Sequence, residues 1–106
     1  MPNDATLLEA QAQMFKALAH PSRLRMLQAL RDGERCVCDL QAVVGHDMST
    51  VSKHLAVLRE AGIVTTEKRG TNIYYRLSLA CLDVFLRCSE NAIRHRLTSQ
   101  IARLDG

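Results

Sequence analysis

The sequence HDMSTVSKHLAVLREAG, residues 46–62, has the pattern of a short amphipathic helix. Its apolar side chains recur at helical spacing, at Val51, Leu55 and Leu58. Asp47 is a suitable N-cap before the helix, and Gly62 is a typical residue at a helix end. We therefore predict one helix between these two residues, with one apolar and one polar face.

Two further helices are expected upstream. One runs from Pro21 to about Asp32 and has four apolar residues facing inward: Leu24, Met26, Leu27 and Leu30. The other lies in CVCDLQAVVG, residues 36–45, and ends in a glycine. Two helices joined by a short turn form a helix-turn-helix, which we predict over residues 36–62.

Downstream of this unit the apolar pattern changes from a helical period to β-prone runs. Residues 63–77, IVTTEKRGTNIYYRL, contain the runs Ile63–Thr66 and Ile73–Leu77 on either side of the turn-forming and basic KRGTN. This pattern predicts a β-hairpin with a basic tip. A helix-turn-helix followed at once by such a hairpin is a winged helix, so the predicted fold class is mainly α with a β-hairpin wing.

The two ends of the chain are predicted to be helices with apolar stripes, over residues 6–19 and 80–104. The stripe on the last helix is the longer one: Leu82, Phe85, Leu86, Ile93, Leu97, Ile101 and Leu104. One small core cannot cover it entirely. We therefore expect both terminal helices to form the interface of a homodimer.

Composition limits the class of protein. The 106 residues suffice for one domain, residues 1–106, and aromatic residues make up only 4%, which favours an aliphatic helical core. The N-terminus lacks the basic start and apolar run of a signal peptide, and no stretch is long enough to span a bilayer. We expect a cytoplasmic protein with no membrane partner, whose four cysteines are thiols. No arrangement of Cys, His and an orienting acid, and no phosphate loop, indicates an enzyme.

The polar side chains of the predicted helix-turn-helix and hairpin suit double-stranded DNA. Short hydroxyl side chains followed by cations are typical of a recognition helix that enters the major groove, and hairpin cations reach phosphate or the minor groove. Five cationic residues and two glutamates between Lys53 and Arg76 give +3, the net charge of the whole chain. The predicted DNA contacts are Ser49, Thr50, Ser52, Lys53, His54 and Arg59 on the helix, and Lys68 and Arg69 on the hairpin.

Three stretches together resemble the ArsR/SmtB family of bacterial metal-sensing repressors: FKALAHPSRLRMLQALRDGERCVCDL (15–40), STVSKHLAVLREAGIV (49–64) and KRGTNIYYRL (68–77). The resemblance implies a homodimeric winged-helix repressor that sits on a palindromic operator and leaves it when its inducer binds. One departure is His20, where the family often has an acidic residue before the proline. We expect this change to remove a good helix cap and to affect stability more than function.

Cys36-Val37-Cys38-Asp39 resembles the Cys-Val-Cys-Asp metal-binding box of this family, which implies a sensor of arsenic, antimony, cadmium or lead. Thiolates are soft ligands that select such thiophilic ions. In a regular helix, residues two apart point about 200° away from each other. Both cysteines can therefore bind one ion only if the helix is frayed or begins after Cys36. Such binding would pull on the helix packed against the recognition helix.

The remaining cysteines, Cys81 and Cys88, are candidates for a third ligand, because Gln41 stands where some relatives have one. They lie about 10 Å apart along the last helix, whereas sulfurs on one ion lie within about 4.6 Å. Three arrangements stay open. One of the two completes a three-sulfur site for arsenic(III) or antimony(III) with Cys36 and Cys38, within a subunit or across the dimer. Alternatively, the helix start unwinds and all four bind cadmium, lead or zinc, or Cys81 or Cys88 only packs.

The main alternative keeps DNA binding and changes the signal. Some family members sense persulfides or oxidants through a cysteine pair. Here Cys36 or Cys38 with Cys81 or Cys88 would serve. Stoichiometric metal binding and a reversible sulfur bridge distinguish the two hypotheses.

Overall fold

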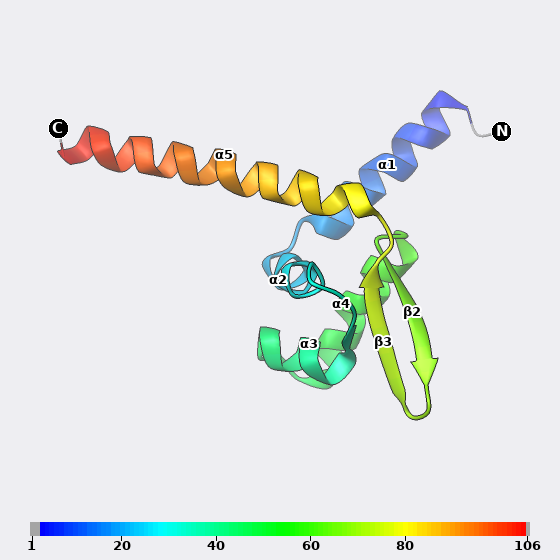
Figure 1. Ribbon diagram of the computed structural model, residues 1–106. Coiled ribbons are helices and arrows are strands. Elements are labelled where there is room, and N and C mark those ends of the chain that lie inside the picture. Colours follow the sequence, from blue (N-terminus) through cyan, green and yellow to red (C-terminus); the bar gives the residue numbers. More distant parts are fainter. Residues whose placement is uncertain (1–2, 106) are drawn as a thin grey trace.

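The computed structural model describes residues 3–105, apart from the side chains of Ala80 and Asp105. Along this part of the chain the elements are α1 (Asp4–Leu18), α2 (Pro21–Ala29), β1 (Arg35–Cys36), α3 (Val37–Val44), α4 (Met48–Glu60), β2 (Val64–Arg69), β3 (Asn72–Leu77) and α5 (Ala80–Asp105). Figure 1 shows that α2, α3, α4 and the sheet form one body, from which α1 and α5 project.

The helix-turn-helix consists of α3 and α4, as predicted. Gly45 ends α3 in the left-handed conformation, with φ 73°, and Asp47 caps α4 by accepting the Thr50 backbone N–H at 2.7 Å. The predicted apolar face of α4 is in the core, where Val51, Leu55 and Leu58 are at most 1% exposed. They pack in one cluster with buried residues of α2 and α3, so the polar face of α4 is left outside.

In α2, the prediction was wrong in two details. The helix ends at Ala29 rather than near Asp32, and Leu24, expected inside, is 37% exposed. The buried face of α2 carries Met26 and Leu27 and continues to the C-cap residue, Leu30. At about 100° per residue, position 24 lies about 110° from the centre of that face, which explains its exposure.

The expectation that His20 removes a helix cap was also wrong. His20 is the N-cap of α2, and its Nδ1 accepts the backbone N–H of Ser22 at 3.0 Å. A neutral imidazole nitrogen has a lone pair, so it can replace the oxygen acceptor of a carboxylate at a cap.

The predicted hairpin is present and longer than expected. Strands β2 and β3 pair from Val64 with Leu77 to Arg69 with Asn72, which leaves Gly70 and Thr71 as the turn. Gly70 has φ 62°, a conformation that glycine adopts without a steric penalty. The two-residue strand β1 was not predicted; it pairs with the other side of β3, giving the order β1-β3-β2.

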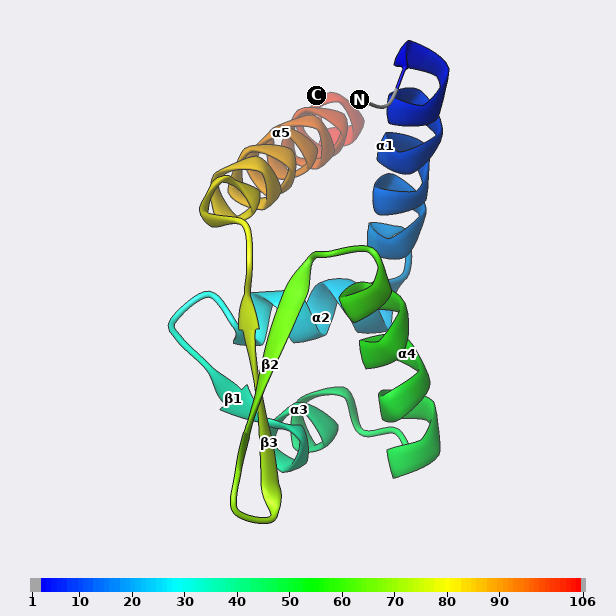
Figure 2. The ribbon, with the colours of Figure 1, turned by 90° about the vertical axis from the view of Figure 1, so that its right-hand side faces the viewer.

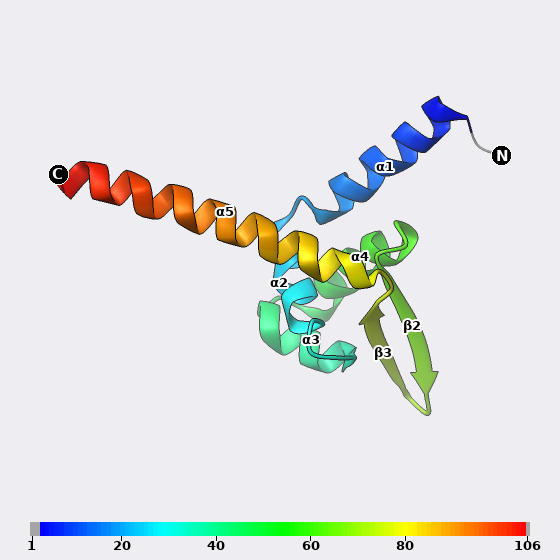
Figure 3. The ribbon, with the colours of Figure 1, turned by 45° about the horizontal axis from the view of Figure 1, so that its top comes forward.

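Both terminal helices are present. α1 begins two residues earlier than predicted because Asn3 Oδ1 accepts the Thr6 backbone N–H at 2.8 Å and so caps the helix. Only the first part of α5 joins the core, through Leu82 and Leu86. Figure 3 shows the rest of α5 extending away from the body. No helix in the described part of the chain is long and apolar enough to cross a membrane.

Candidate DNA-binding surface and cysteine sensor

The N-terminal end of α4 presents polar side chains. Ser49, Ser52 and Lys53 are exposed, and Thr50 is half-buried. Asp47 Oδ1 accepts hydrogen bonds from the Thr50 backbone and from Ser49 Oγ, at 2.7 and 3.1 Å. Hydrogen bonding from Thr50, and then from Ser49, lowers the pKa of Asp47, so its carboxylate stays ionised and fixes the first helical turn.

His54 has a different environment from the other predicted DNA contacts on α4. It is half-buried, with its ring centroid 4.4 Å from that of His20 and 6.4 Å from that of His46. Burial lowers the pKa of His54, and the neighbouring His20 and Arg23 lower it further. Its Nδ1 lies 3.2 Å from Arg23 Nη1 and accepts from it, because a guanidinium only donates. His54 thus joins α4 to α2.

The two predicted contacts on the hairpin also differ. Lys68 is exposed and makes no ion pair within residues 3–105. Arg69 donates to both carboxylate oxygens of Glu34, at 2.5 and 2.9 Å, and to Glu67 at 2.7 Å. Hydrogen bonding to Glu34, and then to Glu67, raises the pKa of Arg69, and Arg69 in turn lowers the pKa of Glu67. Arg69 is therefore occupied by acidic groups of its own chain.

The recognition helix and the hairpin lie on the same side of the molecule. Figure 2 shows the N-terminal end of α4 and the hairpin tip at the end opposite to α1 and α5. Ser52 and Arg59 of α4 line a shallow groove together with Tyr75 of β3. The helix end and the hairpin that carry the predicted DNA contacts thus lie at one end of the molecule, and Arg59 lies where α4 approaches β3.

The cysteines of the predicted metal-binding box meet one condition for joint binding, since α3 begins after Cys36. Cys36 is not part of α3: its backbone is extended, with φ −76° and ψ 163°, and its Sγ accepts the Asp39 N–H at 3.4 Å as an N-cap. Cys38 is exposed in the first turn of α3. Cys36 and Cys38 are therefore not two residues of one regular helix, and their side chains need not point in opposite directions.

The two cysteines of α5 are not near this pair. Cys81 and Cys88 are exposed, and Figures 1 and 2 show α2 lying between α5 and α3. Within residues 3–105, no group of three or more Cys, His, Asp or Glu side chains is arranged to hold a metal ion. A three-sulfur site is thus not assembled within this single chain.

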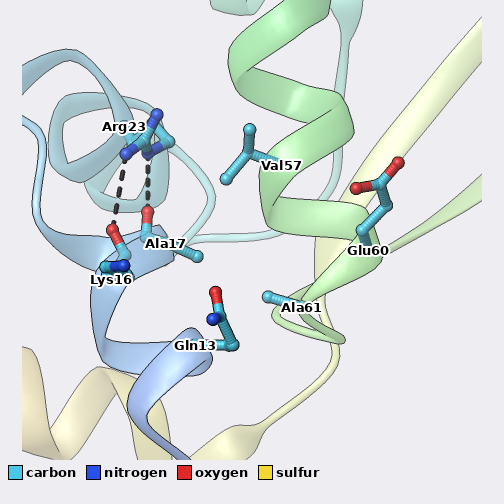
Figure 4. Close-up of a pocket in the computed structure, with 7 residues that line it drawn as sticks. All are labelled: Gln13, Lys16, Ala17, Arg23, Val57, Glu60 and Ala61. Atoms are coloured by element: carbon cyan, nitrogen blue, oxygen red, sulfur yellow. Dashed lines mark hydrogen bonds between the residues drawn. The ribbon is translucent and has the colours of Figure 1, made fainter. Parts of the chain in front are cut away.

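A groove of about 480 Å³ lies between α1, α2 and α4 (Figure 4). Arg23 lines one side of it and donates from Nε and Nη2 to the carbonyls of Ala17 and Lys16, at 2.6 and 3.4 Å. These carbonyls belong to the C-terminal end of α1, and the same guanidinium reaches His54 on α4. Arg23 therefore links a terminal helix to the recognition helix through one side chain.

The sequence analysis missed two charged groupings. One is the set formed by Glu34, Glu67 and Arg69, which depends on a strand too short to show a period. The other joins the turn after α2 to α5: Arg31 lies 2.8 Å from Asp83 and 2.5 Å from Glu90. A sequence shows complementary charges, but only the fold brings positions so far apart into contact.

Known proteins resemble this chain over most of its length. Residues 20–66 match the model of a bacterial regulatory protein family, the arsR family. The arsenical resistance operon repressor of Escherichia coli is 43% identical over 90 residues, covering 77% of each chain. A transcriptional repressor SmtB homolog of Synechocystis is 44% identical over 79 residues, 73% of this chain and 60% of that protein.

A solved structure has the same fold. It is the homodimeric winged helix-turn-helix DNA-binding domain of a possible ArsR-family transcriptional regulator from Mycobacterium bovis, with a TM-score of 0.80 and 31% identity, covering 91% of each chain. The predicted winged helix is thereby confirmed, as is the expectation of a regulator rather than an enzyme. The chain belongs to the ArsR family of bacterial regulatory proteins.

Proposed function

We propose that this protein is a homodimeric transcriptional repressor that binds double-stranded operator DNA and is released by arsenic(III) or antimony(III) at Cys36 and Cys38. The observation that carries the sensor assignment is the position of Cys36 at the N-cap of α3. Because Cys36 precedes the helix and Cys38 lies in its first turn, both sulfurs can approach one thiophilic ion.

The DNA-binding part of the proposal rests on the exposed polar face of α4 and the adjacent hairpin. The exposed side chains of Ser49, Ser52 and Lys53 lie at the N-terminal end of the recognition helix, which enters the major groove first. Arg59 and Lys68 are exposed cations on the same surface and suit phosphates. Arg69 and His54 would have to leave their partners within the chain to contact DNA directly.

The dimer part rests on apolar side chains that their own chain leaves uncovered. On α5 these include Phe85 and Leu97, each 49% exposed, and on α1 they include Leu8, 62% exposed. Both helices project from the body (Figure 3). Exposed apolar surface on this scale is typical of an interface. A second copy of the chain is the occupant that we propose, since the related Mycobacterium bovis domain is homodimeric.

A dimer also offers the missing third sulfur. Arsenic(III) and antimony(III) suit three thiolates, and the chain carries only two in the box. Cys81 and Cys88 are exposed on α5, one of the helices proposed to form the interface. We therefore favour a site that Cys81 or Cys88 of the partner subunit completes. The similarity to an arsenical resistance operon repressor supports arsenic as the inducer.

The proposed release mechanism follows from the contacts of α3. Its first turn carries Cys38, and its buried Leu40 lies in the same core cluster as Leu55 of α4. An ion that draws Cys36 and Cys38 together would thus act on the helix that supports the recognition helix. Two recognition helices must match half-sites about one DNA turn apart, so a small change in their spacing lowers operator affinity. A coupling of about 1–3 kcal/mol suffices for measurable release.

The test uses the reduced protein bound to operator DNA that has been selected in vitro. Fluorescence anisotropy of the labelled DNA measures how much protein is released. Arsenite, antimonite, cadmium and a persulfide donor are titrated separately. The response of Cys36→Ser is compared with the responses of Cys81→Ser and Cys88→Ser. The two α5 variants, Cys81→Ser and Cys88→Ser, serve as matched controls for each other. We expect arsenite or antimonite to release the wild type, Cys36→Ser to remain bound, and one of the two α5 variants to lose the response.

Other outcomes discriminate among the remaining hypotheses. Release by cadmium alone, abolished in all three variants, would indicate a four-sulfur site. Release only by the persulfide donor would overturn the metal hypothesis and leave a redox repressor, for which the exposed thiols of Cys38, Cys81 and Cys88 are accessible. A wild type with no affinity for any selected DNA would overturn the proposed function itself.

A further inference from the structure

Arg69, at the end of β2, has a guanidinium that its neighbours fix in place. It donates to Glu34 at 2.5 and 2.9 Å and to Glu67 at 2.7 Å. Its guanidinium carbon also lies over the ring of Tyr74, 4.7 Å from the centroid. The side chains of Arg69 and Glu34 are still 46% and 34% exposed. An ion pair at this exposure contributes little to stability, so another anion can replace Glu34 at small cost.

The same part of the sheet contains the sensor cysteine. Cys36 in β1 and Glu67 in β2 are both directly paired with Tyr74 in β3. Directly paired residues of antiparallel strands point to the same face of a sheet. The side chains of Cys36, Tyr74 and Glu67 therefore form one row, and Glu34 precedes Cys36 by two residues.

The position of Arg69 gives it two competing uses. It lies next to the hairpin turn, on the side of the molecule that carries the N-terminal end of α4 (Figure 2). A phosphate there would offer a guanidinium the same bidentate geometry that Glu34 offers. Arg69 cannot offer the same edge to Glu34 and to a phosphate at once. The Nη1 and Nη2 N–H groups of that edge donate to Glu34, and the second N–H of Nη2 donates to Glu67.

From this geometry we infer that Glu34 is a positioning residue that holds Arg69 away from DNA, and that an ion at Cys36 strengthens this hold. The inference deepens the proposed function and rests on it. In the DNA-bound state Arg69 exchanges the Glu34 carboxylate for a phosphate. An ion bound by Cys36 and Cys38 fixes the short strand β1 and keeps Glu34 facing Arg69. The signal then reaches the wing directly through β1, in addition to α3.

The experiment measures operator affinity as a function of salt for Glu34→Gln, Arg69→Gln and the double variant. Asp32→Asn is the matched control, since Asp32 is exposed in the same loop, carries the same charge and makes no ion pair within the described residues. We expect Glu34→Gln to raise affinity about two- to fivefold for each wing, the range of an exposed ion pair. Arg69→Gln should reduce the salt slope by about 0.9 for each phosphate that Arg69 neutralises in the wild type.

The double-mutant cycle decides the inference. If Glu34 acts through Arg69, the gain from Glu34→Gln disappears in the Arg69→Gln background. A gain that persists there, or an equal gain in Asp32→Asn, would mean that removing any nearby negative charge helps DNA binding, and the inference would be wrong. A merely structural role of Glu34 would lower affinity and leave the salt slope unchanged, which would also overturn it.

The link to the sensor is measured with arsenite in the same titrations. We expect arsenite to release Glu34→Gln about two- to fivefold less effectively for each wing than the wild type, while Asp32→Asn responds fully. Equal release of Glu34→Gln and the wild type would overturn the link through β1. If arsenite fails to release even the wild type, the proposed inducer is wrong and so is its link to the wing, while the double-mutant cycle still decides whether Glu34 competes with DNA.

Discussion

Helices α4 and α5 are both amphipathic, but they differ in what covers their apolar faces. On α4, Val51, Leu55 and Leu58 are at most 1% exposed, because α2, α3 and the first residues of β2 surround them. On α5, Leu97 is 49% and Ile101 59% exposed. Helical spacing shows where an apolar face lies and does not show whether the same chain covers it. The uncovered face of α5 therefore indicates a partner, whereas the covered face of α4 indicates a rigid support.

The largest effect is expected in the covered region. Leu55→Ala removes a side chain that is 1% exposed and leaves a cavity, so the free energy of unfolding should fall by about 2–5 kcal/mol. Urea unfolding followed by circular dichroism measures it. Val57→Ala, at a neighbouring position that is 37% exposed, is the control and should cost less than about 1 kcal/mol. If the free energy of unfolding fell equally in both variants, the two faces of α4 would not differ in their contribution to stability.

The second prediction addresses the uncovered region. Leu97→Asp places a charge on the exposed stripe of α5, and we expect the dimer dissociation constant to rise about tenfold to a hundredfold while helix content is retained. Sedimentation equilibrium measures the change. Thr98→Asp adds the same charge at an exposed position off the stripe and should leave the dimer intact. An unchanged dimer in Leu97→Asp would show that α5 is not the interface.

The third and smallest effect concerns the ion pairs that connect the core to α5. The side chain of Arg31, in the turn after α2, is 12% exposed and pairs with Asp83 and Glu90 of α5. Arg31→Gln should lower the free energy of unfolding by about 1–2 kcal/mol at neutral pH, because Asp83 and Glu90 lose their ion pairs with Arg31. Asp83 keeps its ion pair with Arg87, and Glu90 keeps its hydrogen bond from Gln28, which limits the loss. Arg25→Gln, at an exposed position of α2, is the control.

The pH dependence of the Arg31 ion pairs sharpens the third prediction. Hydrogen bonding to Arg31 lowers the pKa of Glu90 from its ordinary value of 4.5. A carboxyl with a lowered pKa in the folded state contributes stability that is complete above its unfolded pKa and is lost as the pH falls through its folded pKa. The difference between the wild type and Arg31→Gln should therefore be constant near pH 7 and shrink below about pH 4.5. A difference that does not change with pH would mean that packing, and not charge, joins α2 to α5.

Most of the fold could be predicted because its signals are local. Caps, glycines and apolar spacing placed α3, α4 and the hairpin close to their observed bounds, since these features act within a few residues. The errors occurred where a local signal was ambiguous. Leu24 lies at the rim of the buried face of α2, and His20 caps that helix through a ring nitrogen rather than an oxygen.

The sequence predicted which ligands the candidate site suits, but not which residues of the same chain its side chains contact. The residue types pointed to DNA and to a thiophilic ion, and Ser49, Ser52 and Lys53 are exposed on the face where a recognition helix needs them. The partners of Arg69 and His54 could not be found, because Glu34 and Arg23 lie 35 and 31 residues away along the chain. Their roles toward DNA remain predictions, as do those of all four cysteines.

The sequence by itself determined the elements, the basic character of the hairpin and the thiol chemistry at the start of α3, because these depend on neighbouring residues. Tertiary structure alone decided that β1 joins Cys36 to the wing and that Glu34 holds Arg69. The sequence predicted that part of the apolar stripe on the last helix stays uncovered, but only the fold decided that Leu82 and Leu86 are the part that joins the core. Each of these depends on whether segments distant along the chain pack against each other. No spacing within one segment encodes such packing.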